Sequence, residues 1–309
     1  MSAIKTIKAV VGILYAKNNT QILITKRRKN QFMPDYWELP GGKIEKGEEE
    51  GDSLVRELQE ELGINVCKIS LKHIMSHHYE DKTVNLSIYN VESYRGEVIG
   101  KEGQDVHWCN LQDLNNYKLL PTMRVIINRI CLPEYYWITP NERDAKLILE
   151  KCQNHLNTGA KILQLRSKEF IEQSYIEIIH RLCQSYEARL ILNVPNKTFK
   201  EPCDGWHLTS DELLNYKKRP CTNNKLLGAS THNMKEAKYA ETIPVDYISL
   251  APIEETPSHP NATPLGWEVA KDIVSKSNLP VYLLGGMSKD SLYRALNINA
   301  QGIAGISRI

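Results

Sequence analysis

From Tyr135 onward the sequence alternates short apolar segments with segments of helix length, and this alternation constrains the fold more than any other feature. The apolar segments read YYWITP, AKILQLRS, RLILNV, GWHLTS, KLLGAST, DYISLAP, PVYLLGG and GIAGIS. A strand that is followed by a helix and then by another strand implies a parallel sheet. Eight such strands predict an α/β barrel of the TIM type over residues 134–309.

Residues 1–131 follow a different pattern and predict a separate α+β domain. Four segments read as strands, KAVVGILYA, QILITKR, KTVNLSIYNVESY and DVHWCNL, and one strong helix is expected from about Asp52 to Leu62. A chain of 309 residues also exceeds the usual size of one compact core. Pro133 separates the helical run TMRVIINRICL from the first barrel strand, so we expect the domain boundary between residues 131 and 134.

Composition excludes several classes of protein. A hydrophobic fraction of 41%, a charged fraction of 25% and the lack of a long apolar run indicate a soluble protein that does not enter a membrane. The amino terminus alternates like a strand and lacks the small-residue cleavage site of a signal peptide. Seven cysteines without a CxxC pair favour reduced thiols in the cytoplasm. The scattered net charge of +2 favours free nucleotides over nucleic acid polymers as partners.

Residues 42–64, GKIEKGEEEGDSLVRELQEELGI, concentrate carboxylates on one helix. Glu57, Glu60 and Glu61 have i, i+3 and i+4 spacing, so they share one helical face beside an apolar stripe of leucines. Carboxylates this close repel one another, and a hard divalent cation with oxygen ligands relieves that repulsion. We therefore expect Mg²⁺, with Mn²⁺ as the alternative, to bridge this face to substrate phosphates.

The same residues carry a resemblance to a known family. They fit the Nudix signature G-x5-E-x7-R-E-U-x-E-E-x-G-U at every fixed position, and ITKRR, WELPGGKIE and GKEGQDVHW resemble segments of the MutT nucleotide pyrophosphohydrolases. The resemblance implies a pair between Arg56 and Glu48 that shapes the loop. It implies catalytic and metal-binding roles for Glu57, Glu60, Glu61 and Glu102, with the carbonyl of Gly41 as a further metal ligand. It implies substrate contacts from Arg27, Gly41, Gly42, Lys43 and Thr122.

The implied activity is the hydrolysis of a nucleoside triphosphate to a monophosphate and pyrophosphate, with 8-oxo-dGTP as the expected substrate. Two positions depart from the MutT pattern. Thr122 stands where these enzymes carry the asparagine that reads oxidised guanine, and Ile88 replaces an aromatic residue that packs on the base. A threonine side chain does not reproduce the paired donor and acceptor of an amide. The resemblance therefore constrains the base of the substrate less than it constrains the reaction, which is pyrophosphohydrolysis.

The barrel half resembles thiamine phosphate synthase and the related thiazole tautomerase, through GAKILQLRSK, GWHLTSDEL, LLGASTHNMKEA, DYISLAPI and LLGGM. The resemblance implies ligand contacts from Arg166, Lys168, Asn193, Ser230, His259, Gly285, Gly286 and Ser307. Val194 replaces a magnesium-binding aspartate, and His259 replaces a lysine that faces pyrophosphate. Because an anionic ligand and a cation are both missing, we expect a ligand-binding or altered barrel, with His207 and His259 as candidate proton-transfer groups.

Three functions remain open. The first is a pyrophosphohydrolase that cleanses the nucleotide pool and is fused to a barrel of doubtful activity. The second is a bifunctional enzyme of the thiamine pathway, and the third is a Nudix enzyme regulated by a non-catalytic barrel that senses a thiamine-precursor phosphate. The sequence stops directly after the eighth barrel strand, so that flank needs cover from the first domain or from a second subunit in an oligomer.

Overall fold

The structure is a computed structural model that describes residues 5–16, 20–142, 144–169, 171–256, 261–306 and 309. The chain divides into two compact units, Met1–Ile127 and Asn128–Ile309, which we call unit 1 and unit 2. In the described ranges, no helix has the length and apolar character needed to cross a membrane. The expected fold class, an α+β domain followed by a TIM-type barrel, is confirmed.

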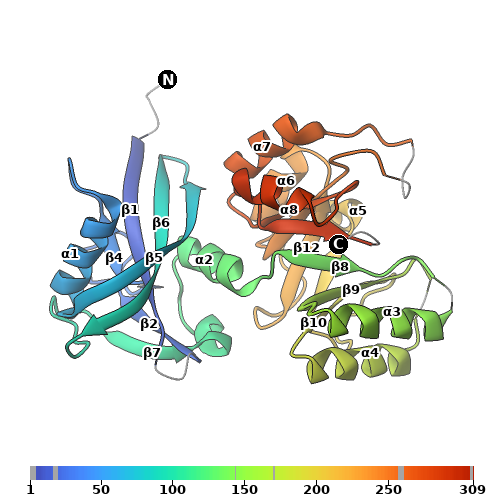
Figure 1. The fold of residues 1–309 in the computed structure, drawn as a ribbon, viewed down its shortest axis with the longest axis horizontal. Helices are drawn as coiled ribbons and strands as arrows, with labels where there is room; N and C mark the ends of the chain where they lie inside the picture. The colour runs from blue at the N-terminus through green and yellow to red at the C-terminus, as the bar shows by residue number, and fades with distance from the viewer. Residues whose placement is uncertain (1–4, 17–19, 143, 170, 257–260, 307–308) are drawn as a thin grey trace. The chain divides into compact units, whose positions relative to one another are not determined.

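Unit 1 is built from two sheets and a helix that covers the larger sheet (Figure 1). The larger sheet has the order β4-β1-β6-β5, in which β1 and β6 run parallel and the other pairs run antiparallel. The strands are β1 (Lys5–Leu14), β4 (Gly41–Lys43), β5 (Asn65–His78) and β6 (Lys82–Arg95). The smaller sheet contains β3 (Trp37–Glu38), β2 (Gln21–Lys26) and β7 (Val106–Asn110), and it is followed by a short 3-10 helix, Leu111–Asn116, and by α2 (Pro121–Cys131).

Helix α1 (Glu50–Leu62) packs on β1, β4 and β5. Leu54, Leu58 and Leu62 recur every four residues on one face and are fully buried. Gly63 ends the helix in the left-handed region at φ 72°, where its N–H bonds to the carbonyl of Gln59. The helix begins two residues before the expected Asp52, because acidic residues in its first turn interact well with the positive end of the helix dipole.

Strand β5 was not expected from the sequence. Its 14 residues are mostly exposed or half-buried, and its pairing with β6 shifts register at three places, between Val66 and Ile69 and again between Leu71 and His73. Two of these shifts place an extra residue on β5, which interrupts the alternation of its side chains between the two faces of the sheet. The strand therefore lacks the strict alternation that identified the other long strands.

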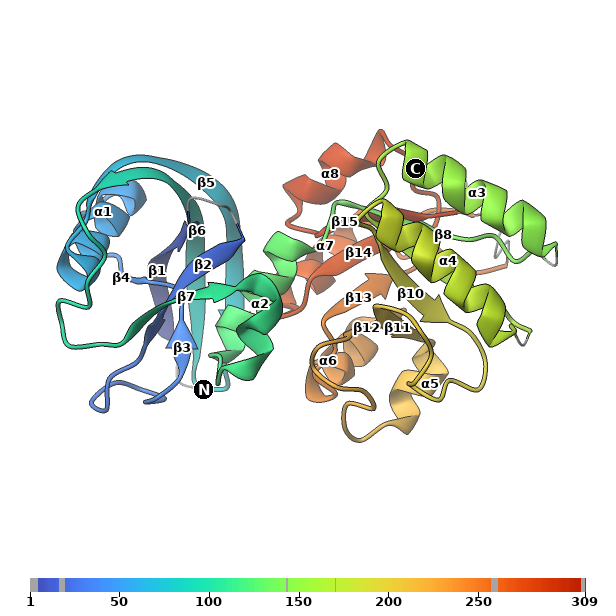
Figure 2. The same ribbon diagram turned by 90° about the horizontal axis from the view of Figure 1, so that it is seen from below.

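Unit 2 is a closed barrel of eight parallel strands with the order β8 to β15 around the ring (Figure 2). The strands are β8 (Tyr135–Ile138), β9 (Ile162–Arg166), β10 (Arg189–Asn193), β11 (Gly205–Leu208), β12 (Leu226–Thr231), β13 (Tyr247–Leu250), β14 (Val281–Leu284) and β15 (Gly302–Gly305). All the expected strands are present. The outer helices are α3 (Ala145–Asn157), α4 (Gln173–Ser185), α5 (Ser210–Asn215), α6 (Met234–Thr242), α7 (Gly266–Lys276) and α8 (Ser291–Asn297).

Tyrosines fill part of the barrel interior. Tyr136, Tyr247 and Tyr282 are fully buried and pack against one another with ring centroids 5.1 to 5.7 Å apart. The Tyr136 hydroxyl lies 2.8 Å from that of Tyr247 and donates to Gln164 Oε1 at 2.9 Å. These hydrogen bonds satisfy the hydroxyls of Tyr136 and Tyr247, and the Tyr282 hydroxyl donates to the carbonyl of Pro133 at 2.5 Å. The interior is therefore a packed core below any ligand site.

The connection from β10 to β11 departs from the alternation of strand and helix. Residues 194–204 are all described and form no helix. Asn196 and Phe199 have φ of 53° and 59°, and Glu201 accepts hydrogen bonds from the backbone N–H groups of Thr198 and Lys200. Two prolines in this segment also oppose a helix, so it forms an irregular loop that is held by its own side chains.

We expect Leu58→Ala to lower the free energy of unfolding of unit 1 by about 2 to 5 kcal/mol, because it removes a fully buried side chain from the face of α1. The matched variant Leu71→Ala, at a side chain that is 50% exposed, should lower it by less than about 1 kcal/mol. Urea unfolding of the full chain, followed by hydrogen exchange in peptides of unit 1, measures both. Equal effects of the two substitutions would contradict the assignment of this core.

Candidate functional site

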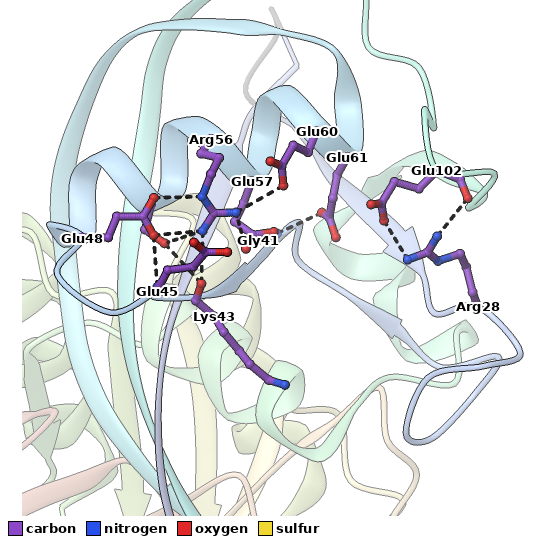
Figure 3. A network of polar contacts seen from close by, with 11 residues as sticks. Arg28, Gly41, Lys43, Glu45, Glu48, Arg56, Glu57, Glu60, Glu61 and Glu102 are labelled. Atoms are coloured by element: carbon purple, nitrogen blue, oxygen red, sulfur yellow. Dashed lines mark hydrogen bonds and ion pairs between the residues drawn. The ribbon is translucent and has the colours of Figure 1, made fainter.

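The face of α1 beside its leucines presents Glu57, Glu60 and Glu61 (Figure 3). The side chain of Glu57 is 17% exposed and that of Glu60 is 55% exposed. Burial raises the pKa of Glu61 to about 8; a hydrogen bond from Gly41 opposes this rise, and the nearby carboxylates of Glu38, Glu57 and Glu102 add to it. Burial also raises the pKa of Glu57. The site thus keeps carboxylates where their negative charge is unfavourable without a cation.

Two glycines bring the backbone of β4 against this face. The N–H of Gly41 donates to Glu61 Oε2 at 3.1 Å. A Cβ atom at Gly42 would lie 2.2 to 2.3 Å from the carboxylate atoms of Glu57, and a Cβ at Gly41 would lie 2.2 Å from the carbonyl of Val10. Any larger residue would displace the loop or the carboxylate, so both positions require glycine.

Arg56 is the cation that the structure places among these acids. Its Nε and Nη2 donate to the two oxygens of Glu48 at 2.8 and 2.9 Å, which confirms the expected ion pair. Its Nη1 donates to Glu57 at 2.9 Å and to Glu60 at 3.2 Å. The hydrogen bond with Arg56 is the main reason that the pKa of Glu48 falls to about 2. The carbonyl of Lys43, whose side chain is exposed, accepts a further bond from Arg56 at 3.3 Å.

Glu102 reaches the same region from the loop before β7. Its charge contributes to the raised pKa values of Glu57 and Glu61, and its carboxylate lies next to that of Glu61 in Figure 3. Arg28 pairs with Glu102 at 2.8 Å and also donates to its carbonyl at 3.2 Å. Sequence reasoning singled out Arg27 and missed Arg28, although both stand in the segment ITKRR.

The carboxylates of Glu57, Glu60 and Glu102 bond to arginines, and they are not arranged as the ligands of a metal ion. Within the described residues, no three His, Cys, Asp or Glu side chains are grouped closely enough to hold a metal ion as they stand. Arg56 occupies oxygens of Glu57 and Glu60. The donor set still fits a hard divalent cation, because it offers carboxylates, one of them buried with a raised pKa, beside a glycine backbone.

Arg27 and Thr122 lie in two other contacts of unit 1. Arg27 Nη1 donates to both oxygens of Glu38 at 2.7 and 2.8 Å, and its Nε donates to the carbonyl of Phe32 at 2.7 Å. Thr122, at the start of α2, hydrogen-bonds the side chain of Tyr79. Tyr79 was missed because it follows β5, the strand that the sequence did not reveal. The substrate roles of Arg27 and Thr122 stay predictions.

Unit 2 contains a cavity of about 490 Å³ at the carboxyl ends of the barrel strands. Its lining includes the predicted ligand residues Arg166, Asn193, Ser230, Gly285 and Gly286. Lys168 is exposed and lies outside the lining. The predicted residues His259 and Ser307 lie outside the described residues.

The floor of the cavity is neutral and polar. His207 is 2% exposed, and its Nε2 lies 3.0 Å from Ser230 Oγ and 3.4 Å from Ser249 Oγ. Burial lowers the pKa of His207 to about 3, with smaller contributions from the charges of Lys197 and Arg166, so the imidazole is neutral at neutral pH. Sequence reasoning missed Ser249 and Gln164. A signal existed for Gln164, because it is a polar residue between two leucines of a fully buried strand.

The opposite wall holds a histidine with a defined tautomer. His232 Nδ1 lies 2.7 Å from the carbonyl of Ala251 and must donate to it, because a carbonyl only accepts. The Nε2 atom of His232 is then the nitrogen free to accept. The sequence analysis named His207 and His259, and it gave no role to His232.

Comparison with known proteins follows the division into units. The family model described as a NUDIX domain matches residues 10–129, and the model described as thiamine monophosphate synthase matches residues 135–309. The 8-oxo-dGTP diphosphatase of Escherichia coli strain K12 is 38% identical over 126 residues, which cover 41% of this chain and 97% of that protein. The thiamine-phosphate synthase of Fusobacterium nucleatum is 31% identical over 165 residues, which cover 52% of this chain and 80% of that protein. Among solved structures, the thiamine phosphate pyrophosphorylase of Pyrococcus furiosus is 26% identical, covers 58% of this chain and 87% of its own, and gives a TM-score of 0.46.

The raised pKa of Glu61 predicts a pH dependence of stability. The native carboxyl holds its proton up to about pH 8, whereas the ordinary pKa is 4.5, so the native state binds more protons between these values. Stability must then fall as pH rises from about 4.5 to about 8 in the absence of divalent cations. Glu61→Gln should remove much of this slope, and Glu49→Gln, at an exposed position, should retain it. Urea unfolding of unit 1 in EDTA across this range provides the measurement, and an unchanged slope in Glu61→Gln would contradict the assignment.

Proposed function

Because the chain belongs to the Nudix family in its first unit and to the thiamine monophosphate synthase family in its second, we propose that unit 1 is a metal-dependent nucleoside triphosphate pyrophosphohydrolase. Its preferred substrate is 8-oxo-dGTP, and its products are 8-oxo-dGMP and pyrophosphate. The observation that carries the proposal is the approach of Glu57 and Glu61 to the glycine backbone of β4, with the charges of Glu60 and Glu102 near enough to raise the pKa of Glu57.

In this proposal the same carboxylates and the carbonyl of Gly41 hold Mg²⁺, or Mn²⁺ in its place. A bound divalent cation would neutralise the substrate phosphates and favour attack of water on phosphorus. The raised pKa of Glu61 supports the assignment, because a cation nearby would favour the ionised carboxylate that burial disfavours.

The protein's own residues position this chemistry. Arg56 fixes the carboxylates of Glu57 and Glu60 through one nitrogen, while its other nitrogens are anchored on Glu48. The backbone of Gly41 and Gly42 and the exposed side chain of Lys43 are the proposed phosphate contacts. Arg27 could contact substrate through Nη2, while its Nη1 keeps both bonds to Glu38 and its Nε keeps the bond to the carbonyl of Phe32.

A second candidate function follows from the family of unit 2. We propose that Arg166, Asn193, Ser230, Gly285 and Gly286 contact a thiamine-precursor phosphate in the barrel cavity. Lys168, His259 and Ser307 stay predicted contacts of the same ligand. Unit 1 would then act on a thiamine-related diphosphate, or the barrel would sense the precursor and regulate unit 1. The cavity at the carboxyl ends of the strands supports this reading, because barrels of this type place their sites there.

We expect Glu57→Gln to lower kcat for nucleotide hydrolysis by at least about 100-fold, because an amide removes a negative charge that the proposed divalent cation needs. The matched variant Glu49→Gln changes an exposed carboxylate just before α1 and should keep kcat within about twofold. Steady-state release of pyrophosphate with Mg²⁺ measures both variants. Hydrolysis retained in Glu57→Gln would refute the site.

The hydroxyl of Thr122 is already bonded to Tyr79, so the wild-type enzyme should discriminate oxidised guanine less than an asparagine enzyme would. We expect Thr122→Asn to raise kcat/KM for 8-oxo-dGTP relative to dGTP by about tenfold, the effect of one added hydrogen bond. The assay includes other nucleoside triphosphates and thiamine diphosphate. A wild-type preference for thiamine diphosphate would put the second candidate function first.

A further inference from the structure

The barrel cavity has few groups that could hold a metal ion. Among the described residues of its lining, Glu255 is the one carboxylate. Val194, which directly follows the lining residue Asn193, is apolar and 5% exposed, so it offers no ligand. Hard divalent cations need several oxygen ligands, usually with more than one carboxylate. The lining by itself does not provide such a set.

The carboxylate of Glu212, beside the cavity, is already committed. Lys197 Nζ lies 2.6 and 2.8 Å from its two oxygens, and the lysine side chain is only 3% exposed. Glu212 Oε2 also accepts from the N–H of Thr209 at 2.8 Å, in a capping box at the start of α5. Thr209 lines the cavity, and the charge of Lys197 is felt by His207 in the same wall. A metal ion at Glu212 would have to displace a buried ammonium.

Lys197 lies in the irregular loop between β10 and β11. Glu201 binds the loop backbone and accepts from Trp206 Nε1 at 3.0 Å, and Phe199 packs on the Trp206 ring with a centroid distance of 5.3 Å. These contacts anchor the middle and second half of the loop on β11. Lys197 is held in place by the loop as well as by its own ion pair.

Arg166 is the cation that faces the cavity unpaired. Among the described residues its guanidinium has no hydrogen-bond or ion-pair partner, although it lines the cavity at the end of β9. A guanidinium offers several donors in one plane and matches one phosphate group well. A diphosphate would bring more negative charge than this single group balances.

We propose that the barrel binds a small molecule with one phosphate group and that it does so without a divalent cation. The geometry behind the proposal is the unpaired Arg166 in the lining together with Glu212 locked by Lys197. The inference deepens the proposed ligand site of unit 2 and is independent of the metal proposed for unit 1.

The first test is calorimetric titration of the full chain with inorganic phosphate, in EDTA and then in Mg²⁺, in the Glu57→Gln background. We expect phosphate to bind in EDTA and Mg²⁺ to change Kd by less than about twofold. Arg166→Gln should weaken binding by at least about tenfold, because charge-assisted hydrogen bonds are lost. The matched variant Arg181→Gln, on α4 with a side chain that is 78% exposed, should bind as the parent does.

The second test counts bound Mn²⁺ by electron paramagnetic resonance in the full chain and its variants. Glu212→Gln should leave the number of bound ions unchanged, whereas Val194→Asp combined with Lys197→Met frees Glu212 and should add one. A bound Mn²⁺ that disappears in Glu212→Gln would overturn the proposal, as would phosphate binding that requires Mg²⁺. Absence of phosphate binding under every condition would refute the ligand site itself.

Discussion

The acidic face of unit 1 depends on the hydrogen bonds that the guanidinium of Arg56 donates to its carboxylates. Helix α1 must bury leucines on one face and keep carboxylates on the neighbouring face, and the closeness of the two faces partly desolvates the acids. Arg56 offsets that cost by bonding Glu48, Glu57 and Glu60 at once. Burial raises the pKa of Glu61 to about 8, and the single backbone N–H that Glu61 receives from Gly41 only partly opposes this rise.

Unit 2 also has to stabilise a partly buried carboxylate, and it does so with a buried lysine. Glu212 is half-exposed but its partner Lys197 is buried, so the pair is held by the loop that precedes β11. Removing only one partner would leave an uncompensated charge, which is costly in a protein interior. In the proposed function the arginine contacts of unit 1 are exchanged for a cation at a partly exposed face, whereas the lysine contact in unit 2 is enclosed. The two units therefore differ in how readily their carboxylates can accept a metal.

Much of the fold followed from sequence periodicity, and its failures have physical causes. The barrel strands were visible because fully buried parallel strands read as unbroken apolar runs. The sequence did not predict β5, because its bulges break the alternation of apolar and polar residues. Tyr79, which directly follows β5, was therefore not identified either. Spacing alone brought Glu57, Glu60 and Glu61 to one face, but it gave no information about Arg28 or Tyr79, which reach their partners through loop conformations. The pair of Lys197 and Glu212 spans 15 residues and depends on an irregular loop that no periodicity describes.

The contrast between the units bears on how one chain can handle two phosphate chemistries. A phosphoanhydride concentrates negative charge on adjacent phosphates, and in the proposed function unit 1 meets such a substrate with carboxylates that favour a divalent cation. A single phosphate group carries less charge, and one guanidinium beside neutral hydroxyl and imidazole groups offsets a larger share of it. The neutral state of His207 matters for this balance, because a second cation next to Arg166 would favour a more highly charged ligand. We therefore expect the charge of each site to select a different class of phosphate compound and to decide whether a metal is bound.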